Sequence, residues 1–173
     1  MVVAKPLTRI VVESLSQRTV PCEWKYAKIT PLYKKGMSTD IDNHLPISFL
    51  PVVAKVLERV VHHQLHSFLS EHKLLSPFQC GFRRNHSTES AAIAFSDYIR
   101  RGMDLGLLTR AVFIDLRKAF DSVDHEILIS KLESYGLKDI KLDWFRNYLA
   151  DRKQLVSFRK EISEPCLITL GVP

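Results

Sequence analysis

The stretch AVFIDLRKAFDSVDH, residues Ala111–His125, carries the strongest indication of fold in this chain. Its apolar run Ala111–Ile114 leads directly into Asp115. A short continuous apolar run is typical of a strand buried on both faces. A carboxylate at the end of such a strand is held on a rigid element at the rim of a sheet, where active sites tend to lie. The alternative is a strand followed by an Asp-rich turn that caps a helix, because Asp is common in turns and at N-caps.

The bulk composition is that of one globular domain. A length of 173 residues is sufficient for a single core, and 46% hydrophobic and 25% charged residues are ordinary fractions. No apolar run approaches the roughly 20 residues that span a membrane, and no basic segment followed by an apolar core opens the chain. The three cysteines lie far apart, which favours a reducing compartment. We therefore expect an intracellular protein, nuclear or cytoplasmic, that is not secreted and has no membrane partner.

The positive charge lies in the first two-thirds of the chain. Residues 1–110 contain 15 Lys and Arg against 9 Asp and Glu, whereas residues 111–173 contain 10 of each kind. A basic part beside a neutral part that carries the carboxylates is the distribution expected of a protein that binds a polyanion. The alternative is the solvated surface of a mildly basic protein.

Apolar spacing, caps and turn residues predict an α+β chain. The expected helices lie within residues 1–20, from Val52 onward, from Ser87 or Thr88 to residues 102–106, from Asp124 to Gly136, and from Asp139 to Leu149. The expected extended segments are residues 29–33, 43–51, 111–114, 154–159 and 166–170, the last two paired as a hairpin. The helix from Val52 has an inward face that includes Val56, Leu57 and Val60. The next helix is expected to bury Ala92, Phe95, Ile99 and Met103.

Several motifs agree in order and spacing with one family. They are Trp24-Lys25-x-Ala27, Ile29-Thr30-Pro31-Leu32-Tyr33-Lys34-Lys35-Gly36, Pro46-Ile47-Ser48, Lys55-x-Leu57-Glu58-Arg59, Gln79-x-Gly81-Phe82-Arg83, Ser87-Thr88, Asp115-Leu116-x-Lys118-Ala119-Phe120-Asp121-x-Val123-Asp124-His125, and Gly171-Val172-Pro173. Together they resemble the reverse transcriptase domain of LINE-type (non-LTR) retrotransposons, over essentially the whole chain. The resemblance implies an RNA-directed DNA polymerase with a right-hand fold. This sequence would supply its helical fingers and the first palm strand and helices. The parts would be residues 1–28 as an N-terminal helix and lead-in, 29–108 as a fingers-like part and 109–173 as a partial palm.

The resemblance also implies the site residues. Asp115 matches the first catalytic aspartate and metal ligand, and the backbone carbonyl of Leu116 would be a further ligand of Mg²⁺ or Mn²⁺. Phe120 matches the aromatic residue under the sugar of the incoming nucleotide, where a rigid side chain excludes a 2′-hydroxyl. Lys34 or Lys35 would lie near the triphosphate, and the segment Gly81, Phe82 and Arg83 would contact the template. The implied partners are an RNA template, a DNA primer and deoxynucleoside triphosphates, and the oligomeric state is left open.

The sequence departs from the family pattern in three places. His44 and Leu45 stand where the family has Tyr and Arg, and Cys80 stands where it usually has Phe. In the resembled family, the arginine at the position of Leu45 binds the triphosphate of the nucleotide through its forked guanidinium, which Leu cannot replace. The resemblance therefore implies that the transition state loses about 2–4 kcal/mol of stabilisation. The sequence also lacks the family's later Asp-Asp hairpin, which would complete the two-ion site and supply neighbours for the strand at 111–114. We therefore expect that strand to be an exposed apolar edge.

These departures predict a partial reverse transcriptase that is inactive as this chain. The alternatives are a non-catalytic remnant that binds nucleic acid and a degenerate transposon product without a function.

Overall fold

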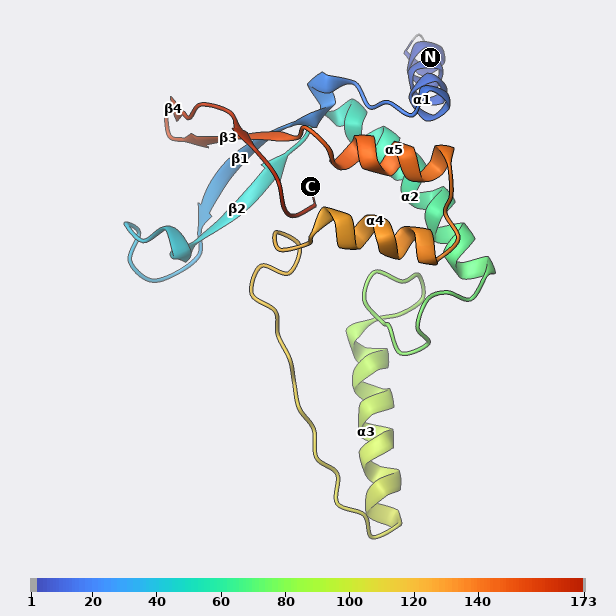
Figure 1. Cartoon of the computed structure of the whole chain (residues 1–173). Coiled ribbons are helices and arrows are strands. Elements are labelled where there is room, and N and C mark those ends of the chain that lie inside the picture. Colours follow the sequence, from blue (N-terminus) through green and yellow to red (C-terminus); the bar gives the residue numbers. More distant parts are fainter. Residues whose placement is uncertain (1–2, 173) are drawn as a thin grey trace. The chain divides into compact units, whose positions relative to one another are not determined.

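The computed structural model describes residues 3–172, so Met1, Val2 and Pro173, the last residue of the Gly-Val-Pro motif, lie outside the described residues. Within this range the chain forms five α-helices, two 3-10 helices and five strands (Figure 1). The helices are α1 (Ala4–Gln17), α2 (Val52–Glu71), α3 (Thr88–Asp104), α4 (His125–Ser134) and α5 (Ile140–Leu149), with short 3-10 helices η1 (Cys22–Lys25) and η2 (Ile41–Asn43). The strands are β1 (Tyr26–Tyr33), β2 (His44–Phe49), β3 (Lys153–Phe158), β4 (Glu161–Ile162) and β5 (Cys166–Leu167).

Contacts divide the chain into two units. The first unit contains residues 1–65 and 118–173, and the second unit contains residues 66–117. Among residues 3–172 no helix combines the length and the apolar character needed to cross a membrane. The mixture of helices and strands confirms the α+β class.

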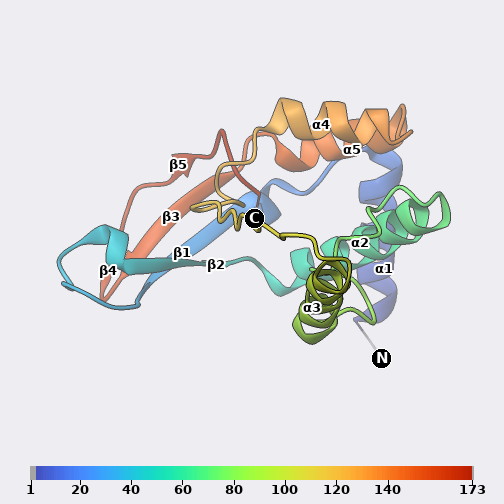
Figure 2. The same ribbon diagram turned by 90° about the horizontal axis from the view of Figure 1, so that it is seen from below.

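The first unit is built on a mixed sheet in the order β2-β1-β3-β4, with β5 paired to β3. Strands β1 and β2 are antiparallel, from Lys28 opposite Phe49 to Tyr33 opposite His44. Strand β1 also runs parallel to β3, so Figure 2 shows β1 between β2 and β3 although β3 follows it by more than a hundred residues. The predicted hairpin of the last two extended segments is confirmed by the antiparallel pairing of β3 with β5.

The core of the first unit lies where α1, α2 and α5 meet. Val11, Val20, Leu57 and Trp144 form one buried cluster, and the Trp144 Nε1 atom donates a hydrogen bond to Ser14 Oγ at 3.2 Å. Ser14 Oγ in turn donates to the Thr19 carbonyl oxygen at 2.6 Å, so the indole proton is satisfied inside the core. These contacts fix α5, and with it the start of β3, against α1.

Most predicted helix ends are confirmed. Ser87 caps α3 through Ser90 in a reciprocal capping box, and Asp124 caps α4 by accepting from the Ile127 backbone nitrogen at 2.9 Å. Gly136 follows α4 with φ of +95°, a conformation that glycine adopts without strain. Asp139 directly precedes α5, as the predicted helix start requires, but its side chain makes no capping hydrogen bond.

The prediction of a strand at Ala111–Ile114, buried on both faces, is wrong. These residues belong to no helix or strand, and the side chains of Val112, Phe113 and Ile114 are 82–86% exposed. A strand buried on both faces needs hydrogen-bonded neighbours at its edges, and no strand among residues 3–172 pairs with this segment. Its one ring contact within the second unit is local, because the Phe113 ring meets Phe95 of α3 edge to face at 5.8 Å. The expected exposure of this apolar segment is confirmed, but the expected strand edge is wrong because the segment forms no strand.

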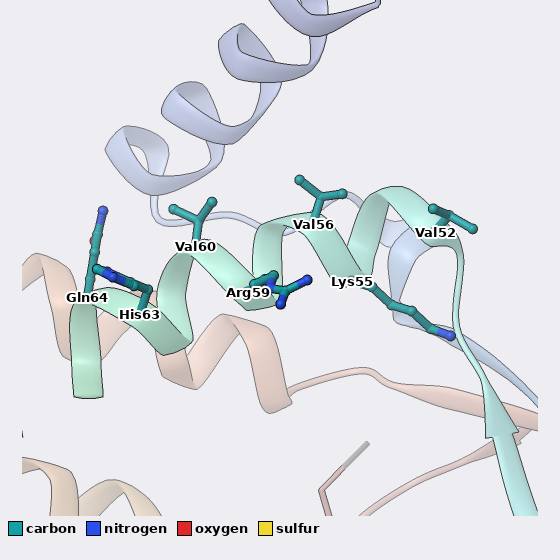
Figure 3. A pocket seen from close by; sticks show the side chains of 7 residues that line it. All are labelled: Val52, Lys55, Val56, Arg59, Val60, His63 and Gln64. Atoms are coloured by element: carbon teal, nitrogen blue, oxygen red, sulfur yellow. The ribbon is translucent and has the colours of Figure 1, made fainter. Parts of the chain in front are cut away.

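The inward face predicted for α2 is only partly correct. Leu57 is 1% exposed, whereas Val56 is 38% exposed. In Figure 3, Val52, Val56 and Val60 project from one side of α2, and they line a surface pocket together with Lys55, Arg59, His63 and Gln64. The predicted burial of α3 is wrong: Ala92, Phe95 and Met103 are exposed and Ile99 is only partly buried. None of the residues 66–117 is buried.

Candidate functional site

The tip of the β1–β2 hairpin presents Lys34 and Lys35. The Lys34 backbone nitrogen donates to the Asn43 carbonyl oxygen at 2.9 Å, which extends the strand ladder by one hydrogen bond. The Tyr33 hydroxyl closes the turn by donating to the Gly36 carbonyl oxygen at 2.6 Å. Both lysine side chains are exposed, so the hairpin holds two adjacent cations on a turn fixed by hydrogen bonds.

Strand β2 places His44 and Leu45 directly beside this tip. The His44 ring lies 5.7 Å from the Tyr33 ring, edge to face, and its Nδ1 atom lies 3.0 Å from the Asp40 carbonyl oxygen. Leu45 pairs across the ladder with Leu32, and both side chains are about half exposed. The strand ladder therefore presents two partly exposed leucines, Leu32 and Leu45, next to the lysine pair.

The turn that carries Phe120 is held by the last described residues. The Val172 backbone nitrogen donates to the Phe120 carbonyl oxygen at 3.1 Å, and the Gly171 nitrogen donates to the Val123 carbonyl oxygen at 2.8 Å. The Nε2 atom of His125 donates to the Gly171 carbonyl oxygen at 2.7 Å, which makes Nε2 the protonated nitrogen. We call these three hydrogen bonds the Gly171 clamp.

Gly171 is required by the clamp for two reasons. Its φ is +89°, and a Cβ atom there would lie 2.9 Å from the Asp121 carbonyl oxygen. Only a residue without a side chain permits this close approach of two backbone segments. The Phe120 side chain itself is 59% exposed, so the clamp fixes its backbone and leaves the ring accessible.

The second unit contains the remaining predicted site residues. Asp115 and Leu116 lie on the exposed segment that follows α3, and the Asp115 carboxylate has no hydrogen-bond or ion-pair partner among residues 3–172. Arg83 donates from Nη1 to the Ser76 carbonyl oxygen at 2.8 Å and to the Gln79 carbonyl oxygen at 3.4 Å. Arg83 therefore braces its own loop.

Gly81 and Phe82 lie at the exposed end of the same loop. Phe82 has a φ of +58° and is 85% exposed. The predicted site residues are thus divided: Lys34, Lys35 and Phe120 belong to the first unit, and the others belong to the second.

The carboxylates do not form a two-ion site by themselves. Among residues 3–172 no group of three or more His, Cys, Asp or Glu side chains lies close enough to hold a metal ion. Asp124 is engaged as the cap of α4, which supports the turn-and-cap interpretation for that residue. Because two divalent ions need several oxygen ligands, the set present in this part of the chain does not fit the pair.

Arg152 is the charged residue that sequence reasoning missed. It is 1% exposed at the start of β3 and lines a cavity in the first unit together with Lys118 and Asp121. The only signal in the sequence was a basic residue directly before an alternating strand, which usually marks a solvated position. Its burial follows from the pairing of β3 with β1, two strands far apart in the chain.

Comparison with known proteins identifies the class. A family model described as reverse transcriptase (RNA-dependent DNA polymerase) matches residues 33–173, and the chain therefore belongs to the reverse transcriptase family. The probable RNA-directed DNA polymerase from transposon BS of Drosophila melanogaster is 33% identical over 160 residues, which cover 88% of this chain and 17% of that protein.

The relatives also identify the kind of element. The RNA-directed DNA polymerase from mobile element jockey of the same fly is 30% identical over 154 residues, covering 88% of this chain and 17% of that protein. A Pol polyprotein from type-1 retrotransposable element R2 of Popillia japonica is 28% identical over 133 residues, covering 76% of this chain and 18% of that protein. The chain is a partial reverse transcriptase domain of the non-LTR retrotransposon type, and it spans about a sixth of the length of these curated relatives.

Proposed function

We propose that these residues are the fingers and the first part of the palm of an RNA-directed DNA polymerase that copies an RNA template from a DNA primer. The observation that carries the proposal is the family match over residues 33–173, which includes every candidate site residue. The proposed parts are residues 1–28 as lead-in, 29–108 as fingers and 109–173 as partial palm. They are defined by motifs and not by contacts, since β1 and β3 fall in different parts and pair in one sheet.

Asp115 is the proposed catalytic carboxylate and the proposed ligand of a divalent ion, with the Leu116 carbonyl oxygen beside it. Reverse transcriptases use divalent metal ions, and Mg²⁺ or Mn²⁺ is the expected kind because both prefer oxygen ligands. Such ions position and activate the reacting phosphate oxygens when bound. Asp115 supports this role by its exposure and by its lack of any partner among residues 3–172, which leave both carboxylate oxygens available.

The first unit supplies the proposed contacts to the incoming deoxynucleotide. Lys34 and Lys35 carry charge to the triphosphate from the hairpin tip, and Phe120 lies under the sugar. The Gly171 clamp favours the sugar role because a steric gate discriminates only when its backbone is fixed. In the second unit, Gly81, Phe82 and Arg83 are the proposed template contact.

Primer extension tests the catalytic part of the proposal. We expect no extension by the isolated chain with Mg²⁺ or Mn²⁺, because its candidate site residues include one acidic ligand, Asp115. The same assay on a longer version of the chain that includes the family's Asp-Asp hairpin is expected to give product, and Asp115→Asn to abolish it. Extension by the isolated chain, or an active longer Asp115→Asn variant, would contradict the assignment.

The exposed lysine pair at the hairpin tip favours a second candidate function, nucleic-acid binding without catalysis. Single-stranded RNA binding is expected to weaken with salt, with a slope of about −0.7 per phosphate contact in the logarithmic plot. The double variant Lys34→Ala, Lys35→Ala is expected to reduce that slope by about 1.4.

A matched control is the double variant Arg159→Ala, Lys160→Ala. It removes another adjacent exposed basic pair, at the turn between β3 and β4. Equal losses in the two double variants would show that general charge, and not the hairpin tip, carries the binding.

A further inference from the structure

The guanidinium of Arg152 is buried, and two of its three nitrogen atoms are unused as donors. Its Nη1 atom donates to the Tyr148 carbonyl oxygen at 3.1 Å, and its Cζ atom lies 4.8 Å from the centroid of the Tyr148 ring. The Nε and Nη2 atoms are buried and have no hydrogen-bond partner among the described residues. Buried polar groups are nearly always hydrogen-bonded, because leaving a charged donor unpaired costs more than most single interactions gain.

The two unused atoms have a specific geometry. Nε and Nη2 form one edge of the planar guanidinium, and that edge donates two parallel hydrogen bonds to two oxygens of one phosphate or carboxylate. The edge that lacks partners is therefore the one suited to an oxyanion.

The cavity next to Arg152 has the size and charge for such a group. Its volume is about 400 Å³, and its polar lining comes from Ser48, Lys118, Asp121, Arg152 and Gln154. The lining contains two cations, Lys118 and Arg152, and one carboxylate, Asp121. Asp121 accepts no hydrogen bond from Nε or Nη2 of Arg152. The cavity wall formed by β1 and β2 includes Ala27 and Pro46, and neither Lys34 nor Lys35 lines it.

A second buried cation adds to the positive field. Lys25, on η1 directly before β1, is 6% exposed. Burial lowers the pKa of Lys25; Asp151 opposes this effect, and the charge of Arg152 adds to it. Two cations that repel each other in a buried region are stabilised together by a bound anion.

We propose that this cavity is a phosphate-binding site in which two phosphate oxygens accept hydrogen bonds from Nε and Nη2 of Arg152, with Lys118 as a second cation. The site does not depend on polymerase activity and differs from the triphosphate contact proposed for the hairpin tip. The phosphate belongs to a free nucleotide or to a nucleic-acid backbone, and the chemistry of recognition is the same for both.

The test measures thermal unfolding of the chain and the ¹H–¹⁵N signal of Arg152 Nε during titration with inorganic phosphate at constant ionic strength. At a hundredfold excess over Kd, phosphate is expected to raise the midpoint by about 5–10 °C and to shift the Nε signal. The Arg152→Met variant is expected to lose the phosphate response while remaining at least as stable as the parent without phosphate. Arg152→Lys keeps the charge but not the two-donor edge, and is expected to bind at least about tenfold more weakly. Arg159→Met removes an exposed arginine of the same hairpin and serves as the control.

The outcomes are distinguishable even if Arg152→Met fails to fold, because the Nε signal is read in the parent chain. A phosphate-insensitive Nε signal overturns the proposal. So does a stability loss shared non-additively by Arg152→Met and Asp121→Asn, which would assign Asp121 as the internal partner. Repeating the titration with a deoxynucleoside triphosphate and with a short single-stranded oligonucleotide identifies the source of the phosphate. Failure of primer extension, by contrast, leaves this result unchanged.

Discussion

Replacing Gly171 with Ala is expected to break the clamp on the Phe120 turn. At φ of +89° an alanine is strained by about 1–2 kcal/mol. Its Cβ would also lie 2.9–3.1 Å from the O, Cα and C atoms of Asp121, all backbone atoms that cannot move aside cheaply. Such overpacking costs about 1–3 kcal/mol, and the entropy lost by the unfolded chain returns about 0.4–1 kcal/mol. The net expectation is a destabilisation of about 1–5 kcal/mol.

Denaturant unfolding measures the total loss of unfolding free energy in Gly171→Ala, and amide hydrogen exchange shows which part of the chain is destabilised. Because the hydrogen bonds from the Gly171 and Val172 nitrogens are the ones displaced, their protection is expected to fall before that of the core amides. Two other glycines separate the causes. Gly106 has a positive φ of +71° but open space around a new Cβ atom, so Gly106→Ala tests the backbone strain alone. Gly81 has no positive φ and also has open space, so Gly81→Ala tests neither strain nor crowding. We expect the cost to fall in the order Gly171, Gly106, Gly81. A Gly171→Ala variant no less stable than Gly106→Ala would refute the close-packing argument.

Three further predictions concern the first unit. Leu57→Ala, at 1% exposure, is expected to cost about 2–5 kcal/mol in denaturant unfolding, whereas Val56→Ala on the adjacent exposed face is expected to cost less than about 1 kcal/mol; equal costs would contradict the placement of the core. Tyr148→Phe removes the hydrogen bond from the Tyr148 hydroxyl to Glu58 Oε1 at 2.8 Å and is expected to cost about 1–2 kcal/mol at pH 7. Burial, with Glu58 adding to it, raises the pKa of Tyr148 well above the value near 10 that the unfolded phenol has, so the parent chain loses stability as pH rises above about 10 and the Phe variant lacks that loss. Leu45→Arg is expected to strengthen deoxynucleoside triphosphate binding by at least about tenfold, measured by calorimetry, because it restores a forked cation beside the hairpin tip; an unchanged Kd would remove that tip from the nucleotide site.

The sequence correctly predicted those features that depend only on residues close together in the chain, such as helix caps and helix ends. Ser87 and Asp124 cap their helices because their side-chain oxygens accept hydrogen bonds from backbone nitrogens three residues further on. This interaction does not depend on contacts with distant parts of the chain. Gly136 ends α4 for a similarly local reason. Helical periodicity predicted the buried face of α2 less exactly, because the apolar stripe is wider than the face that packs against the core. Periodicity alone therefore could not show that Leu57 is buried while Val56 is partly exposed.

Features that depend on distant partners were not predictable in this way. Arg152 is buried because β3 runs parallel to β1, and no pattern within the Asp151–Gln154 segment encodes that neighbour. The candidate roles of Asp115 and Phe120 came from family resemblance, whereas the Gly171 clamp required the observed hydrogen bonds between residues 120–125 and 170–172.

Asp115 and Phe120 differ in how firmly the described residues hold them. Phe120 lies on a turn already fixed by the clamp, while the segment Ala111–Ile114 that leads to Asp115 is extended and exposed. Ordering four residues costs about 4–8 kcal/mol of backbone entropy. Burying the side chains of Val112, Phe113 and Ile114 returns about 4.5–9 kcal/mol. The two terms nearly cancel, so the apolar run alone does not fix the carboxylate. Hydrogen bonds to a strand paired with Ala111–Ile114 would supply the stabilisation that the apolar run lacks, and such a pairing would also fix the position of Asp115.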